Sequence, residues 1–396
     1  MFNRKAFFGL GLAMALTGAA QAQQPDLDTA ISTLRQEADR AGFSGAIVVL
    51  QGGQPIVEEY RGLADQESGR ANGADTRFNI ASIGKFITAM AYRAAADDAG
   101  IVDFAGVRPA SFLPQYAELF DPQLSVGDLM YHRTTVESFI LAPEAETRTI
   151  EADNNAEIFD LVVEAQDGPI EVRRDGLAYN NGNAIITGQV TAAMTGQSYE
   201  DVVQSLVFDP ANASRATFTR LSQADALEIA LPYVEEGFSA ESMMRRRPGS
   251  EPVELPTAYP RQYMTPLTEA VSMAAGGLYM SAMDLARIGA SSIDGTVLTR
   301  EQTAELCTSG MPVPGRIFGM GCGGRVLSPE LTRWGHGGGA PGINSQLAIY
   351  PELDLVLVVL SNHNGRATPV VNAFEAALIP QDHTERNLSG GFVILD

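Results

Sequence analysis

The amino-acid sequence predicts a mixed α/β (α+β) fold in which both ends of the chain build one antiparallel sheet and a mainly helical lobe is inserted between them. Strand-like patterns occur near the two ends, whereas helical spacing of apolar residues starts at residue 82. Elements in this order favour a sheet shared by both termini over a regular alternation of strand and helix. The expected sheet lobe comprises residues 23–81 and 265–380, the helical lobe residues 82–264, and a C-terminal tail residues 381–396.

The first 22 residues have the pattern of a secretory signal peptide. Arg4 and Lys5 precede the apolar stretch Phe7–Leu16, and Ala20-Gln21-Ala22 supplies the small residues of a cleavage site. The apolar stretch is too short to span a bilayer, and no later stretch approaches about 20 uninterrupted apolar residues. We therefore expect an exported bacterial protein, periplasmic or secreted, without a membrane span.

The expected elements follow from local patterns. Phe43–Leu50 and Pro55–Tyr60 are expected as two strands, because Gly52-Gly53 between them is a hairpin signal. From Ser82 to Gly100 apolar residues recur at helical spacing. Short amphipathic helices are expected at three places further on: Val126–Tyr131, Ile158–Glu164 and Asn183–Met194.

Strand patterns return towards the C-terminus. The expected strands are Arg316–Val326, Ser345–Tyr350 and Leu355–Leu360, and a helix is expected at Pro369–Leu378. Residues 351–354, Pro-Glu-Leu-Asp, form the expected turn between the last two strands. The acidic segment Glu144–Glu157 is interpreted as a solvated connector.

Charge and metal-ligand content exclude several classes of function. The formal net charge is −21, which argues against nucleic acid and anionic membranes as partners. Four histidines are widely spread and no His-x-x-x-His pair occurs, so neither a metal nor another cofactor is expected: His132, His336, His363 and His383. Cys307 and Cys322 are compatible with a disulfide or with two separately buried thiols. The oligomeric state stays open.

Lysine usage points to one residue. Of the 27 Lys and Arg residues only Lys5 and Lys85 are lysines, and Lys5 lies in the expected signal peptide. Arginine cannot lose its proton in a protein, whereas a desolvated lysine can act as a base near neutral pH. Ser82 precedes Lys85 by three residues, which places both on one face of a helix. The pair therefore predicts a serine nucleophile with a lysine base, although a Ser-x-x-Lys spacing alone is a weak signal.

Two further groups could complete such a site. Tyr179 could relay a proton if a neighbouring ammonium lowers its pKa, and Asn181 offers an amide that orients Lys85 or a substrate. The run from His336 to Gly339 would let a strand approach a ligand and expose its N–H groups as an oxyanion hole. The alternative interpretations are a half-buried tyrosine beside a turn and a plain glycine-rich turn.

Together, three motifs in chain order resemble the penicillin-recognising serine hydrolases, and in particular the group of class C β-lactamases, D-alanyl-D-alanine carboxypeptidases and family VIII-type esterases. The motifs are Ser82-x-x-Lys85, Tyr179-x-Asn181 and His336-x-Gly338. Weaker local matches support the resemblance at Leu124–His132, at Ala275–Ser281 and around Ser361-Asn362.

The resemblance implies a β-lactamase/transpeptidase-like fold and a small-molecule or peptidoglycan-like substrate. The implied roles are nucleophile for Ser82, base or proton relay for Lys85, second acid/base for Tyr179, positioning amide for Asn181, third motif for His336 and Gly338, and oxyanion donor for Gly339. The reaction expected from these roles is hydrolysis of an ester or amide through an acyl-enzyme; the acyl donor is left open between a β-lactam, a D-amino-acid peptide and a carboxylic ester.

Two departures from the family pattern bear on specificity. Relatives read His-Thr-Ser-Gly-Leu where this chain has His132-Arg133-Thr134-Thr135-Val136, so no role is assigned to the threonines. The third motif starts with His336 where many β-lactamases have lysine. A histidine of ordinary pKa is mostly neutral at pH 7. This favours an esterase or D-peptidase over a β-lactamase.

Three competing interpretations follow from the same residues. The run His336–Gly339 mimics a lipase oxyanion motif, but no Gly-x-Ser-x-Gly elbow follows it. Gly319-x-Gly321-x-x-Gly324 has a dinucleotide-binding spacing, yet no helix pattern comes after it, so it is interpreted as a glycine-rich strand. The remaining alternative is a non-catalytic penicillin-binding or sensor protein of the same fold.

Overall fold

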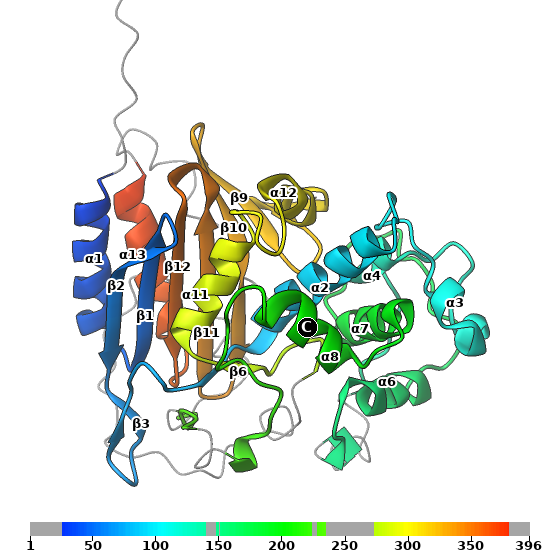
Figure 1. Cartoon of the computed structure of the whole chain (residues 1–396), viewed down its shortest axis with the longest axis horizontal. Coiled ribbons are helices and arrows are strands. Elements are labelled where there is room, and N and C mark those ends of the chain that lie inside the picture. The colour runs from blue at the N-terminus through cyan, green and yellow to red at the C-terminus, as the bar shows by residue number, and fades with distance from the viewer. Residues whose placement is uncertain (1–25, 140–147, 150, 224–227, 235–272, 380–396) are drawn as a thin grey trace, which may run out of the picture.

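The structure is a computed structural model that describes residues 26–139, 148–149, 151–223, 228–234 and 273–379 (Figure 1). The predicted signal peptide and the predicted C-terminal tail lie outside these residues. Within them, the order of elements agrees with the predicted plan: strands from both ends of the chain share one sheet, and the helices of the middle section lie beside it.

The central feature is an eight-stranded antiparallel sheet with the strand order β2-β1-β12-β11-β10-β9-β8-β7. The strands are β1 Gly45–Gln51, β2 Gln54–Arg61, β7 Met311–Val313, β8 Arg316–Phe318, β9 Gly323–Ser328, β10 Leu331–Ala340, β11 Ile343–Tyr350 and β12 Leu355–Ser361. Gly45 of β1 pairs with Ser361 of β12, so an early strand and a late strand of the chain are neighbours in the sheet. Every residue of β11 and β12 is buried, which explains their nearly continuous apolar sequences.

Helices cover both faces of this sheet. Helices α1 (Leu27–Arg40) and α13 (Ala367–Leu378) pack together, and α13 lies against β11 and β12 (Figure 1). On the other face α11 (Ala282–Ser291) contacts β1, β11 and β12. Alternate residues of β1 accordingly join two separate apolar cores. Helix α1 was not among the predicted elements, although Asp26 caps it by accepting a hydrogen bond from Thr29 N at 3.0 Å.

The helical section is centred on α2 (Gly84–Asp98), which packs against α7 and α8. Its other helices are α3 Pro109–Phe112, α4 Val126–Met130, α6 Asn155–Glu164, α7 Asn181–Thr195 and α8 Tyr199–Val203. The three short helices predicted here are confirmed as α4, α6 and α7. The prediction of a solvated connector over Glu144–Glu157 is wrong at its C-terminal end, because residues 155–157 form the first turn of α6. Asn154 caps this turn, and its Oδ1 accepts a hydrogen bond from Glu157 N at 3.0 Å.

Smaller elements complete the chain. The two-residue strand β5 (Phe78–Asn79) ends just before the first motif and pairs with the two-residue strand β6 (Tyr279–Met280). The remaining short elements are β3 Leu63–Asp65, β4 Arg70–Ala71, the 3₁₀ turns at Ala81–Ile83, Pro114–Leu119, Leu221–Gln223 and Pro351–Leu353, and a π-helical turn at Gln204–Phe208.

The strand predicted over Arg316–Val326 is divided by a tight turn into β8 and β9. Gly319 and Gly321 lie in this turn, so their interpretation as strand residues is wrong. Gly321 has a φ of 64°, and a Cβ atom there would lie 2.2 Å from the carbonyl oxygen of Lys85. The turn can approach α2 so closely only because glycine occupies this position.

Of the two states left open for the cysteines, the structure has the disulfide. Cys307, in α12 (Arg300–Thr308), is bonded to Cys322, in the turn just before β9, across a separation of 15 residues. Closing a loop of about this length stabilises a protein by about 3 kcal/mol in the chain-entropy treatment. The bond ties the turn that contains Gly321 to α12.

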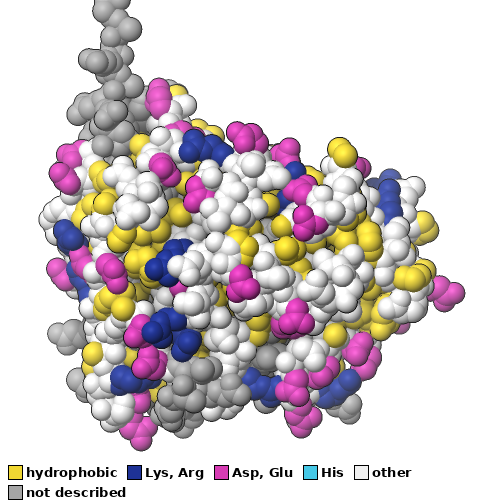
Figure 2. Space-filling view, in the orientation of Figure 1, with side chains coloured by type: hydrophobic (Ala, Val, Ile, Leu, Met, Phe, Trp, Pro, Cys, Tyr) yellow, Lys and Arg dark blue, Asp and Glu magenta, His cyan; other side chains and the backbone are white. Residues whose placement is uncertain are grey.

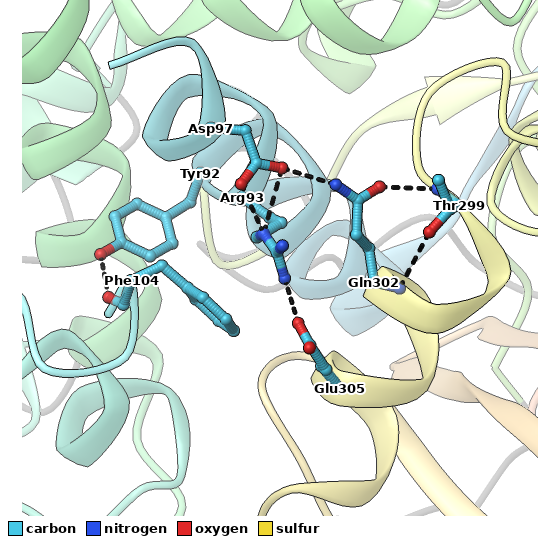
Figure 3. Close-up of polar contacts among 7 residues, drawn as sticks. All are labelled: Tyr92, Arg93, Asp97, Phe104, Thr299, Gln302 and Glu305. Carbon is cyan, nitrogen blue, oxygen red and sulfur yellow. Dashed lines mark hydrogen bonds and ion pairs between the residues drawn. The ribbon is translucent and has the colours of Figure 1, made fainter. Parts of the chain in front are cut away.

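Polar contacts also join α12 to α2 (Figure 3). Arg93 of α2 pairs with Asp97 at 3.0 Å and with Glu305 of α12, while Gln302 Nε2 donates to Asp97 at 2.7 Å. On the other side of α2, Tyr92 OH donates to the carbonyl oxygen of Phe104. The helix that starts near Ser82 is therefore tied to its neighbours along its second half.

Acidic side chains are scattered over the face seen in Figure 2, interspersed with basic and apolar ones, rather than gathered in one patch. Among the described helices, none has both the length and the apolar character that crossing a membrane requires. In the same part of the chain, no group of three or more His, Cys, Asp or Glu side chains is arranged to hold a metal ion.

Candidate active site

Ser82 lies in the 3₁₀ turn Ala81–Ile83 that leads directly into α2. The residue before it, Ala81, has a φ of 46°, a conformation uncommon for a residue with a Cβ. Its N–H donates to Asn79 Oδ1 at 2.8 Å, which supports this backbone. Such strain persists only where the surroundings impose it.

Two glycines allow other backbone segments to close around Ser82. A Cβ atom on Gly276 would lie 2.3 Å from the carbonyl oxygen of Ala81, and one on Gly338 would lie 2.3 Å from that of Ile80. Gly276 precedes β6 and Gly338 belongs to β10, so the turn that carries Ser82 is enclosed from two sides. Any larger residue at either position would push these segments apart.

Lys85 is 1% exposed and its amine contacts three oxygens. Nζ lies 3.1 Å from Ser82 Oγ, 2.8 Å from Asn181 Oδ1 and 2.6 Å from the carbonyl oxygen of Ala275. Burial lowers the pKa of Lys85 to about 7. Near neutral pH a large fraction of this amine is therefore unprotonated.

Tyr179 approaches Ser82 from the segment that precedes α7. Its OH donates to Ser82 Oγ at 3.0 Å, and Lys85 Nζ lies 4.9 Å from its ring centroid. Asn180 caps α7 by accepting from Gly182 N at 2.8 Å, which places Asn181 at the first position of the helix. Burial raises the pKa of Tyr179, so the lowered pKa that the sequence analysis named as a condition for proton relay is not found, and the phenol is neutral.

The third motif lies on β10. His336 is buried, and its Nδ1–H donates to the carbonyl oxygen of Gly337 at 2.5 Å. Burial, assisted by repulsion from Lys85, lowers the pKa of His336 to about 3, so the ring is neutral at physiological pH. Gly338 lies against Ile80, as described above, and Gly339 pairs with Asn344 of β11. The structure thus brings the three motifs together around Ser82.

Comparison with known proteins agrees with this arrangement. A model of the family described as Beta-lactamase matches residues 27–380. The chain belongs to the Beta-lactamase family. It shares the fold of the penicillin-recognising serine hydrolases, as the motifs predicted, and family membership supports a serine hydrolase activity.

The individual relatives of this protein have low sequence identity to it. PbpX of Bacillus subtilis (strain 168) is 21% identical over 326 residues, which cover 82% of this chain and 72% of that protein. The crystal structure of a penicillin-binding protein from Bacillus halodurans aligns with a TM-score of 0.69 at 19% identity, covering 87% of this chain and 98% of that one. D-amino acid amidase from Ochrobactrum anthropi SV3 aligns with a TM-score of 0.66 at 21% identity, covering 89% and 97%. At these identities the structural likeness shows the fold alone.

The sequence assigned no role to His132 or Thr134, but the structure connects both to Tyr179. His132 stacks on the Tyr179 ring, and Thr134 donates at 2.6 Å to Asn183 Oδ1, whose side-chain amide contacts His132. The available signal was the segment ending at His132, which resembles the family pattern. Its chemical role depends on contacts with residues about 50 positions away, which local sequence does not reveal.

Proposed function

We propose that the protein is an exported serine hydrolase that cleaves an ester or an amide through an acyl-enzyme on Ser82. The observation that carries the proposal is the position of Ser82 Oγ, 3.1 Å from a buried lysine amine and 3.0 Å from the hydroxyl of a half-buried tyrosine. A base and an acid thus lie within hydrogen-bond distance of one nucleophile. No metal or other cofactor is needed for this chemistry.

The hydrogen bonds around Ser82 support an assignment of the protons of Lys85, Ser82 and Tyr179. The carbonyl of Ala275 and the amide oxygen of Asn181 can only accept, so they take two N–H donors of Lys85. A neutral amine then has one lone pair left, and that lone pair faces Ser82. Because Tyr179 OH donates to Ser82 Oγ, the serine proton is directed towards Lys85. Lys85 therefore takes the serine proton, and Tyr179 supplies one to the leaving group.

Stabilisation of the tetrahedral intermediate is assigned to backbone donors. The N–H of Ser82 lies in the 3₁₀ turn that leads into α2, near the helix N-terminus, where the helix dipole favours negative charge. Gly339 follows the third motif on β10, and its N–H is proposed as the second donor. Asn181 has a positioning role, because its side chain orients Lys85.

The neutral state of His336 favours an ester or a D-amino-acid amide or peptide over a penicillin as acyl donor. A lysine at the start of the third motif would present a permanent cation to a substrate carboxylate, whereas His336 presents none. The fold shared with D-amino acid amidase is compatible with an amide substrate. The pattern of residues 1–22 supports export.

We expect His336→Lys to shift specificity towards anionic acyl donors. A charged hydrogen bond contributes about 1.5–3 kcal/mol, so acylation by a penicillin should become about tenfold faster. Acylation by a neutral activated ester should change less than about threefold. His336→Gln, which keeps the position uncharged, is the control. Equal effects of His336→Lys on both donors would argue against a charge-based preference.

The experiment that tests the proposed function is intact-protein mass spectrometry of the mature protein and of Ser82→Ala. Each is mixed with an activated short-chain ester, a penicillin and a D-alanyl-D-alanine peptide, and product release is followed in parallel. A Ser82-dependent adduct or turnover is expected, with faster release from the ester or peptide than from the penicillin. Stable acylation without release would instead indicate the sensor-type alternative. Turnover that survives in Ser82→Ala would refute the assigned nucleophile.

A further inference from the structure

His132 is in direct contact with Tyr179 from the interior of the protein. The two rings stack with centroids 4.4 Å apart and planes inclined by 27°. His132 is 2% exposed, and Phe318 of β8 packs against its ring in an edge-on arrangement at 5.3 Å. The His132 ring therefore forms a buried surface on which the Tyr179 ring rests.

Hydrogen bonds determine which nitrogen of His132 carries the proton. The backbone N–H of Asn180, the residue after Tyr179, donates to His132 Nδ1 at 3.1 Å. A backbone N–H cannot accept, so Nδ1 is the unprotonated nitrogen and the neutral ring carries its proton on Nε2. The side-chain amide of Asn183 contacts the same Nδ1 at 3.1 Å.

Thr134 determines the orientation of that amide. Its hydroxyl donates to Asn183 Oδ1 at 2.6 Å, so the Nδ2 group of Asn183 faces His132 as a donor. Both Thr134 and Asn183 are buried, which makes an unpaired polar atom at this place costly. The threonine that departs from the family pattern thus supports the unprotonated state of His132 Nδ1.

The loop of residues 132–136 also holds the backbone on both sides of Tyr179. Ala178 N donates to the carbonyl oxygen of His132 at 2.8 Å, and Asn180 Nδ2 donates to that of Val136 at 2.7 Å. His132 itself has a φ of 54°, a conformation that histidine adopts more readily than most side chains. This backbone directs its ring towards Tyr179 and away from solvent.

We propose that His132 is a positioning residue for Tyr179, fixed in its Nε2–H form by Asn180, Asn183 and Thr134. Stacking restricts the Tyr179 ring, and the bond to Asn180 N fixes the segment that carries it. The inference rests on the proposed function, because positioning matters only if Tyr179 transfers a proton. A misplacement of about 1 Å can cost about 10²-fold in rate.

The first test is a double-mutant cycle of His132→Phe with Tyr179→Phe, measured by kcat and KM on an amide or unactivated ester. His132→Phe keeps an aromatic ring but removes the acceptor. We expect kcat to fall about 10²-fold with KM changed less than about threefold, and a loss below about threefold in the Tyr179→Phe background. Losses of equal size in both backgrounds would overturn the proposal.

Matched variants separate positioning from general damage. His363→Phe replaces another buried histidine outside the site, and kcat should be unchanged. Thr134→Val removes the hydroxyl that orients Asn183 and should lower kcat, whereas Thr134→Ser should restore it. If Thr134→Val and Thr134→Ser have the same kcat, the proposed role of the hydroxyl is wrong.

The second test needs no substrate: side-chain ¹⁵N NMR of the wild-type protein at pH 7. The Nε2–H neutral form of His132 is expected, and an Nδ1–H form or an imidazolium would overturn the proposal whatever the activity. Failure of the proposed function would be recognised differently, as the absence of any acylation of Ser82. The two failures are therefore distinguishable.

Discussion

Lys85→Arg should lower kcat/KM by about 10³-fold, with loss of the acylation step. Arginine keeps the positive charge and can still donate hydrogen bonds, but it cannot lose a proton to become a base. General acid–base groups contribute typically 10²–10⁴-fold, and Lys85 is the only amine within reach of Ser82 in the described part of the chain. The measurement is pre-steady-state acylation of Ser82 together with circular dichroism to establish that the variant is folded.

Two companion variants keep this test decisive. Lys85→Met, which has no charge to bury, should be equally inactive and covers the case in which the arginine disturbs the fold. Arg93→Lys is the matched control on the same helix, because Arg93 pairs with Asp97 and Glu305 outside the site (Figure 3). It should retain activity. Turnover of Lys85→Arg close to that of the wild type would contradict the proton-transfer role.

The pH dependence follows from the lowered pKa of Lys85, about 7 against an ordinary 10.5. Because the neutral amine is the base, kcat/KM should rise with pH through about 7 and then level off. Between about 7 and 10.5 the unfolded chain binds the Lys85 proton and the folded protein does not. The free energy of unfolding, relative to Lys85→Met, should therefore rise with pH across that window. A flat kcat/KM profile from pH 5 to 9 would contradict the assignment.

Tyr179→Phe should slow the reaction by about 10²–10³-fold on substrates with poor leaving groups. The phenol is neutral in the resting protein because burial raises its pKa, and its proton already points at Ser82 Oγ. An amide or alkyl leaving group needs that proton, whereas an activated aryl ester leaves without it. The loss should therefore be small on the activated ester and large on the amide, with acylation and deacylation measured separately.

The matched control is Tyr92→Phe. Tyr92 is buried and, like Tyr179, donates a hydrogen bond, but to the carbonyl oxygen of Phe104 and away from Ser82. Its loss should reduce the free energy of unfolding by about 1 kcal/mol without changing the dependence on the leaving group. If Tyr179→Phe lowers the rate equally for both kinds of leaving group, Tyr179 is not the acid.

The sequence predicted most of the sheet because its information is local. Continuous apolar strands such as Leu355–Ser361 and the glycine pair between β1 and β2 are recognisable in any context. The division of the segment Arg316–Val326 was not predicted, since glycines are compatible with either a strand or a turn. The close approach of Gly321 to the backbone of α2, which requires the turn, is a tertiary contact.

By itself, the sequence identified the candidate site residues, through the only lysine outside the predicted signal peptide and the order of three short motifs. Proton positions were decided by the tertiary structure. Burial lowers the pKa of Lys85, as the sequence allowed, but raises that of Tyr179, for which the sequence had offered a lowered pKa only as a condition for proton relay. The role proposed for His132 also comes from the structure, since its contacts join residues that are distant in the chain. The physical reason is the same in each case: a pKa and a ring contact depend on the local dielectric and on neighbours brought together only by folding.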